Sequence, residues 1–228
     1  MYQNQKIMIM IPARDGSTGI KNKNLQIVGK ETILARSIRH ANNSQYTDIV
    51  SVSTNGADIK NEALQHGAQI IDRPDSISTA SSLTEEAMIH AVQNIVCDYC
   101  VVLQPTSPFR SPGLIDRCIS SIIDEGADSL VTGWKFHDFC FYKENNESSW
   151  MSTFDYVHRP MRQTLNMRDF KYFDCGNVYI TKTEFLLAHK CRLGGKIIVE
   201  PVSSLECVQI DDYDDLELCH KIATGEVN

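Results

Sequence analysis

Short apolar runs alternate along the chain with segments whose apolar residues recur every three or four positions. The run Ile7–Pro12 is uniformly apolar, which is typical of a strand buried on both faces of a parallel sheet. The segment from about Thr32 to Ala41 has helical spacing instead. The same alternation predicts strands at Asp48–Thr54, Ala68–Ile71, Tyr99–Leu103 and Ser129–Thr132, and helices at Asp58–His66, about Leu83–Ile95 and behind Ser111-Pro112. The serine–proline pair is typical of a helix start.

This order predicts an α/β fold with a doubly wound, mostly parallel sheet. The regular pattern ends near Trp134, and we interpret about 135–173 as an insertion of short strands or loops with a hairpin turn at Asn145–Ser148. Order returns in strands at Asn177–Ile180 and Lys196–Val199 and in helices at Thr183–His189 and Tyr213–Ala223. We expect residues 1–228 to form one domain that carries this insertion.

The composition excludes several classes of protein. With 42% hydrophobic residues and a formal net charge of −7, the chain is not predominantly disordered and is not suited to bind nucleic acid or anionic membranes. Neither a membrane span nor a signal peptide is predicted, so we expect a cytoplasmic protein. A reducing compartment argues against a disulfide framework among the eight cysteines. Cys97 and Cys100 are interpreted as a helix end followed by a buried strand.

The loop after the first strand offers phosphate-binding chemistry. It follows the carboxyl end of a strand, where open α/β sheets bind ligands, and its small residues allow backbone N–H groups to approach a phosphate closely. Arg14, Lys21 and Lys23 add positive charge, which suits a triphosphate. The loop matches neither GxxxxGK[ST] nor GxGxxG. A glycine-rich surface loop with solvated lysines would show the same composition.

Two later segments carry polar groups at strand ends. In Leu103–Arg110, two prolines stiffen a turn that could aim Gln104 at a base or sugar hydroxyl, or that serves only as a rigid connector. In Gln209–Asp215, Asp211 ends a strand and is the better candidate for a Mg²⁺ ligand. The remaining carboxylates, Asp212 included, are explained equally well by the first turn of a helix.

Together these segments resemble the acylneuraminate cytidylyltransferase family, in order and over nearly the whole chain. The family's IPAR-x-GS loop and KN pair stand here as Ile11–Ser17 and Lys23-Asn24, and its LQPTSP stretch as Leu103–Pro108. Arg73-Pro74, followed by residues 79–82, is similar to its base-contacting segment, and residues 53–56 are similar to its STDG turn, with Asn55 in place of aspartate.

The resemblance implies a Rossmann-like nucleotidyltransferase in which the anomeric hydroxyl of a sialic acid attacks the α-phosphate of CTP and pyrophosphate leaves. It implies a homodimer, with the insertion serving dimerisation and sugar binding, and Mg²⁺, or Mn²⁺ in its place, as cofactor. The implied site residues fall into four groups by role. They are Arg14, Lys23 and Asp211 for catalysis; Ala13, Arg14, Ser17, Lys23, Asn24, Arg73 and Ser82 for the nucleotide; Gln104, Arg162, Asn177 and Tyr179 for the sugar; and Asp211 and Asp212 for the metal.

Three departures from the family pattern keep alternatives open. Cys175 replaces the usual asparagine of an NGxxY pattern, for which Asn177 is a substitute, and Cys140 lies near the place of a usual lysine. A legionaminate, pseudaminate or other nine-carbon acid is therefore an alternative substrate. Gln209 replaces the first aspartate of a terminal D-x-D, which leaves a non-catalytic nucleotide-binding regulator as a further alternative. A nucleotidyltransferase for a sugar phosphate has no support from the family motifs.

Overall fold

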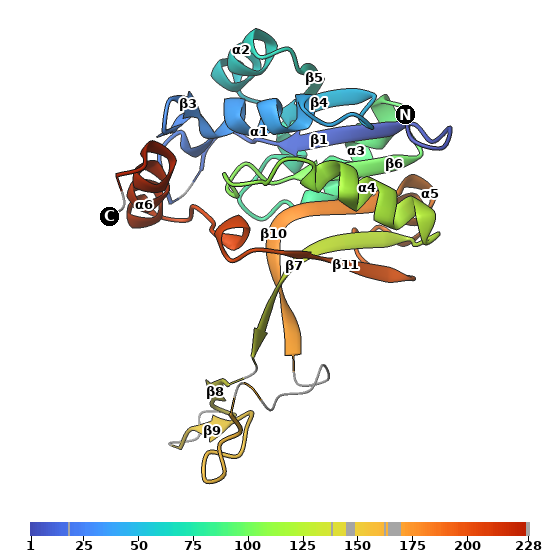
Figure 1. Cartoon of the computed structure of the whole chain (residues 1–228). Coiled ribbons are helices and arrows are strands. Elements are labelled where there is room, and N and C mark those ends of the chain that lie inside the picture. The colour runs from blue at the N-terminus through green and yellow to red at the C-terminus, as the bar shows by residue number, and fades with distance from the viewer. Residues whose placement is uncertain (18, 138, 145–148, 162, 164–169, 227–228) are drawn as a thin grey trace.

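The computed structural model describes residues 1–17, 19–137, 139–144, 149–161, 163 and 170–226. Its centre is a seven-stranded sheet of order β11-β7-β10-β6-β1-β4-β5 (Figure 1). β10 runs antiparallel to β6 and β7, and the other neighbouring pairs are parallel. The predicted mostly parallel sheet is therefore confirmed. The seven strands are β1 (Ile7–Pro12), β4 (Ile49–Thr54), β5 (Gln69–Asp72), β6 (Tyr99–Leu103), β7 (Ser129–His137), β10 (Phe170–Lys182) and β11 (Ile197–Val202).

Helices cover both faces of this sheet, as a doubly wound fold requires. Because successive side chains of a strand point to opposite faces, Ile9 of β1 faces one core and Met10 the other. The first core packs against α1, α2 and α4, and the second against α3 and α5. The helices are α1 (Ile33–Asn42), α2 (Ala57–Gln65), α3 (Thr84–Asn94), α4 (Leu114–Asp124), α5 (Thr183–His189) and α6 (Tyr213–Thr224).

Several smaller elements complete the fold. A short β-ribbon, β2 (Ile27–Val28) with β3 (Glu31–Thr32), follows the 3-10 helix η1 (Lys23–Leu25). Val28 and Ile33 share a third apolar cluster with Ile210 and with Cys219 of α6. Two further 3-10 helices are η2 (Asp75–Ile77) and η5 (Leu205–Cys207). In the described part of the chain, no helix has both the length and the apolar character needed to cross a membrane.

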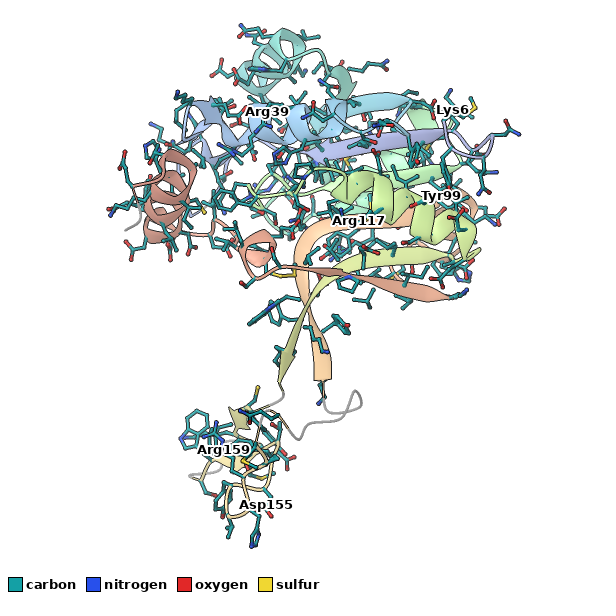
Figure 2. All side chains as sticks on the ribbon, in the orientation of Figure 1. Lys6, Arg39, Tyr99, Arg117, Asp155 and Arg159 are labelled. Carbon is teal, nitrogen blue, oxygen red and sulfur yellow. A yellow bond between two sulfur atoms is a disulfide. The ribbon has the colours of Figure 1, made fainter. Side chains whose placement is uncertain are left out.

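The insertion differs from its predicted form. β7 and β10 do not end at the sheet but continue together as an antiparallel arm that projects from the body (Figure 1). Aromatic residues with high strand propensity build the arm, yet Trp134 and Phe173 are exposed because no core lies against them. The arm carries a small outer lobe with β8 (Phe141–Tyr142) and β9 (Met151–Ser152), where Figure 2 labels Asp155 and Arg159. The predicted turn at 145–148 lies outside the described residues.

The predicted start of α4 is wrong by two residues. The helix begins at Leu114, and Gly113 precedes it in a left-handed conformation with φ 75°. Ser111 belongs to the preceding turn instead, because its amide donates to the Glu206 carboxylate at 2.9 Å and its carbonyl accepts from the Leu114 amide at 3.2 Å. Glycine adopts this conformation without the penalty of a Cβ atom, which explains its place at the helix start.

One cysteine pair departs from the expectation of free thiols. The sulfurs of Cys175 and Cys207 are bonded, and their Cα atoms lie 4.6 Å apart although 32 positions separate them in sequence. β10 and η5 bring them together, which spacing along the chain does not reveal. Cys97 and Cys100 are buried free thiols, Cys97 just beyond α3 and Cys100 on β6, as interpreted. Burial raises the pKa of both thiols.

Candidate functional site

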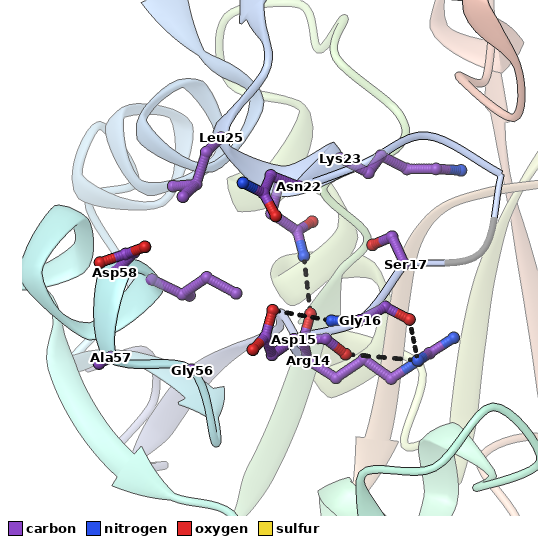
Figure 3. Close-up of a pocket in the computed structure, with 12 residues that line it drawn as sticks. Arg14, Asp15, Gly16, Ser17, Asn22, Lys23, Leu25, Gly56, Ala57 and Asp58 are labelled. Atoms are coloured by element: carbon purple, nitrogen blue, oxygen red, sulfur yellow. Dashed lines mark hydrogen bonds between the residues drawn. The ribbon is translucent and has the colours of Figure 1, made fainter.

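The loop after β1 folds back on itself through its own polar groups. Arg14 Nη1 donates to the Gly16 carbonyl at 2.8 Å, and the Gly16 amide donates to Asp15 Oδ1 at 2.8 Å (Figure 3). Asn24 Nδ2 donates to the Arg14 carbonyl at 3.4 Å, which joins the two ends of the loop. Gly16 has φ 72°, a conformation that favours glycine. These contacts hold Arg14 at the carboxyl end of β1.

A cleft of about 280 Å³ brings together seven of the residues predicted for the site. They come from the β1 loop, η1, the segments after β5 and β6, and the turn before α3, all at the carboxyl edge of the sheet. The seven are Arg14, Ser17, Lys23, Asn24, Arg73, Ser82 and Gln104. An adjoining cavity of about 160 Å³ shares four of them and continues toward α2 (Figure 3). Ligands of open α/β sheets bind at this edge.

Positive charge dominates the cleft. Lys23 Nζ donates to the Ile210 carbonyl at 2.7 Å and lies 3.5 Å from Asp211 Oδ1, with only 14% of its side chain exposed. Arg73 is buried and its Nη2 donates to the Ser53 carbonyl, which fixes the guanidinium at the cleft wall. Burial and the nearby charge of Arg14 lower the pKa of Arg73 to about 10, so it remains protonated at neutral pH. The arrangement suits a ligand with several negative charges.

Ala13 and Ser82, also predicted to bind the nucleotide, have internal partners as well. The Ala13 amide donates to the Ser53 carbonyl at 3.0 Å and the residue is fully buried. Its N–H is therefore committed to the backbone of β4. Ser82 Oγ accepts from the Thr79 amide at 3.0 Å and stabilises the turn before α3. Ser82 still lines the cleft, whereas Ala13 supports it from beneath.

The predicted sugar-binding residues separate into two groups. Gln104 lines the cleft, and its Oε1 would lie only 3.2 Å from a Cβ at Gly176, whose φ of 62° also favours glycine. Asn177 is fully buried and its Nδ2 donates to the carbonyls of Phe109 and Glu206. Tyr179 is buried as well.

The Tyr179 hydroxyl donates to Asp174 at 2.9 Å. Burial and that carboxylate raise the pKa of Tyr179 to about 12. Neither Asn177 nor Tyr179 lines the cleft, so their contact with a sugar stays a prediction without geometric support. Arg162 lies outside the described residues.

The two predicted metal ligands have different surroundings. Asp212 caps α6, because its carboxylate accepts from the Asp215 amide at 2.9 Å in a reciprocal capping box. Asp211 is 74% exposed and meets Lys23 beside the cleft. Within the described residues, no cluster of three or more His, Cys, Asp or Glu side chains is arranged to hold a metal ion. The geometry thus leaves Asp211 as a single carboxylate and assigns Asp212 to the helix.

Gln209 is bound to the backbone of β10. Its Nε2 donates to the Cys175 carbonyl at 2.5 Å and packs where a Cβ at Gly176 would stand. An amide can make this contact with a carbonyl, whereas a carboxylate would repel it. The replacement of an acidic residue by glutamine therefore has a structural reason in the closure of β10 onto the segment before α6.

Sequence reasoning missed part of the site wall. Asp15, Asn22 and Asp58 line the smaller cavity with the four shared residues. Asn55 supports this wall from the turn after β4, because its Oδ1 accepts from the Asp15 amide at 3.0 Å. The signal was available, since the turn at 53–56 also follows a parallel strand and so reaches the same edge of the sheet.

Comparison with known proteins agrees with this geometry. A family model described as "Cytidylyltransferase" matches residues 8–160, which include the β1 loop, Arg73 and Gln104. The chain belongs to this cytidylyltransferase family. Solved cytidylyltransferases share the fold: a CMP:2-keto-3-deoxy-manno-octonic acid synthetase complexed with CTP superposes with a TM-score of 0.70 at 14% identity, over 97% of this chain and 100% of that one.

The names of several curated relatives include acid sugars. N-acylneuraminate cytidylyltransferase of Escherichia coli O18:K1:H7 (strain RS218 / NMEC) is 27% identical over 93% of this chain and 51% of its own length. CMP-N,N'-diacetyllegionaminic acid synthase of Legionella pneumophila is 28% identical over 57% of this chain and 61% of its own. 3-deoxy-manno-octulosonate cytidylyltransferase of Rickettsia felis is 31% identical over 57% and 52%. The chain spans about half the length of the first of these relatives.

Proposed function

We propose that this protein transfers the cytidylyl group of CTP to the anomeric hydroxyl of a nonulosonic acid, with N-acetylneuraminate as the first candidate, and releases pyrophosphate. The observation that carries the proposal is the single cleft shared by Arg14, Lys23, Arg73 and Gln104. The three cations suit a triphosphate, and the amide suits a sugar or base. The names of the curated relatives support an acid sugar as acceptor.

The chemistry follows from charge and position. The sugar hydroxyl attacks the α-phosphate, the bond to the β-phosphate breaks, and the developing charge on pyrophosphate meets Arg14 and Lys23. Lys23 is held by the Ile210 carbonyl and Arg14 by its own loop, so both charges are positioned before the substrate arrives. The reaction needs no covalent intermediate on the protein.

Of the two predicted metal ligands, Asp211 is the better placed to bind a divalent cation, Mg²⁺ or Mn²⁺. Mg²⁺ binds through one or two carboxylates with phosphate oxygens and water completing its shell, and Asp211 offers one exposed carboxylate beside the cleft. When bound, the ion withdraws charge from the phosphate oxygens. Asp211 then has two roles, as its carboxylate also faces the Lys23 ammonium.

The identity of the acceptor is tested by pyrophosphate release. The protein is incubated with CTP, Mg²⁺ and separately N-acetylneuraminate, legionaminate, pseudaminate or 3-deoxy-manno-octulosonate. We expect release with one nine-carbon acid and little with the eight-carbon acid. Release with legionaminate or pseudaminate alone would assign the alternative substrate. CTP binding without release from any acceptor would contradict the proposal and support the non-catalytic regulator.

We further propose that the arm packs against a second copy of the chain. Trp150 of the outer lobe is 65% exposed, and Phe141 and Phe173 are also exposed although they are aromatic. Monomeric proteins rarely leave such a group of aromatic side chains in water, and aromatic residues are enriched in interfaces. The long arm of β7 and β10 would let one subunit reach its partner without disturbing its own sheet.

A further inference from the structure

A second pair of cavities lies between α1 and the start of α4, apart from the cleft. One, of about 300 Å³, is lined by Arg39, His40, Arg110 and the first turn of α4. The other, of about 220 Å³, is lined by Arg36, His40, Arg110 and η5. His40 and Arg110 therefore form a wall between the two. Figure 2 labels Arg39 on α1 and Arg117 on α4, which mark the two sides of this region.

Several buried polar atoms in this wall have no partner. Arg110 is only 9% exposed, and its Nε and Nη1 contact no hydrogen-bond acceptor. Arg36 Nε and His40 Nδ1 are buried and unpartnered in the same way. Buried polar groups normally find partners, because an unmade hydrogen bond costs about 1–3 kcal/mol. Four such atoms lie on three side chains that line these two cavities.

The neighbouring acidic groups are already committed. Glu31 pairs with Arg39 at 2.6 Å and lies 3.5 Å from Arg36. Asp116 accepts from the Ser44 hydroxyl and from backbone amides, and Glu206 accepts from the backbone amide of Ser111. None of these carboxylates reaches Arg110 or His40 with a hydrogen bond among the described residues. The guanidinium of Arg110 therefore has no counter-ion of its own.

Positive charge from three arginines acts on His40. The pKa of His40 falls to about 3 because the ring is buried and three arginines repel its protonated form. These arginines are Arg110, Arg39 and Arg36. The arginine charges that disfavour the protonated ring favour an anion, and α4 adds the partial positive charge of its amino end.

We infer that these cavities form a second ligand site, one that binds a small phosphate-type oxyanion between Arg36, His40 and Arg110. A tetrahedral oxyanion suits the site better than a planar carboxylate, because the unpartnered nitrogens come from three side chains and require acceptors in several directions. Both cavities exceed the volume of one such ion. Oxyanion binding at this site does not depend on cytidylyl transfer, so the inference is independent of the proposed function.

Arg110 connects these cavities to the cleft through one loop. Arg110 Nη2 donates to the Gln104 carbonyl at 2.8 Å and to the Asn177 carbonyl at 3.2 Å. Gln104 lines the cleft, while Arg110 and Ser111 line the second site. An oxyanion on Arg110 would thus act on the residue that holds Gln104 in place.

NMR of ¹³C-labelled histidine tests the inference with the full-length protein. Inorganic phosphate is titrated against chloride at constant ionic strength, and the His40→Gln variant identifies the His40 signal among the seven histidines. We expect a saturable shift of the His40 signal and a higher His40 pKa in phosphate, because the oxyanion offsets the arginine charges. A Lys23→Gln variant, weakened at the cleft, should retain this shift.

Variants separate binding from structure. Arg36→Gln should weaken phosphate binding at least tenfold, whereas Arg117→Gln, a matched change on α4 outside both cavities, should leave it unchanged. Circular dichroism and thermal unfolding check that each variant folds. Arg110→Lys is a second test of phosphate binding, because it keeps the positive charge but removes the guanidinium, and it should also weaken binding. The absence of a saturable His40 shift, its loss in Lys23→Gln, or equal affinity in Arg36→Gln and the unmodified protein would each overturn the inference.

Discussion

Lys23 offers the most direct test of how the cleft works. Replacement by methionine removes the ammonium while keeping a side chain of similar length. Two unit charges about 4 Å apart interact by about 4 kcal/mol at an effective dielectric constant of about 20. The open side of the cleft screens part of this energy, so we expect a loss of about 2–3 kcal/mol in transition-state binding. At about 1.4 kcal/mol per tenfold, kcat/KM for CTP should fall about 30- to 150-fold.

The assay is continuous pyrophosphate release, with CTP binding measured by calorimetry. Lys23 also donates to the Ile210 carbonyl, so Lys23→Met should lower the free energy of unfolding by about 1 kcal/mol as well. Lys60→Met is the matched control, because Lys60 pairs with Asp72 at 2.6 Å on the surface and lines neither cavity of the site. A kcat/KM for Lys23→Met within about threefold of the control would refute the assignment of its charge to the triphosphate.

Three further outcomes follow from the structure. Asp212→Ala should cost about 1 kcal/mol of stability through loss of the α6 cap and leave the Mg²⁺ requirement unchanged, whereas Asp211→Asn should raise the Mg²⁺ concentration for half-maximal activity. Between pH 6.5 and about 3, His40 is protonated in the unfolded chain but not in the folded protein, where it is buried. The free energy of unfolding should therefore fall as the pH drops, by up to about 1.4 kcal/mol per pH unit. Urea unfolding in phosphate-free buffer should show a shallower fall for His40→Gln. Trp150→Ser should shift the protein from dimer to monomer in light scattering without changing its helical content, and an unchanged mass would contradict the proposed interface.

The sheet was predictable because its signal is local. β1 and β6 read as uniformly apolar runs, and both are buried on two faces between layers of helices. The arm was not predictable in the same way. β7 and β10 leave the core after a few residues, and beyond that point no buried face imposes an alternating pattern on Trp134 or Phe173.

The site was predictable where a residue follows the carboxyl end of a parallel strand. Arg14, Arg73 and Gln104 all do so, and all line the cleft. Asn177 failed this rule, because it lies on the antiparallel strand β10 with its amide committed to Phe109 and Glu206. The pairing of Cys175 with Cys207 depends on the packing of η5 against β10, which no local pattern encodes.

The contact between Lys23 and Ile210 joins residues 187 positions apart. A ribosome delivers the first of them early and the second near the end of synthesis. Until then the β1 loop lacks the carbonyl that holds its lysine, even though most of the sheet is already present. A nascent chain can therefore complete this contact, and with it this side of the cleft, only after nearly all of its sequence has been synthesised.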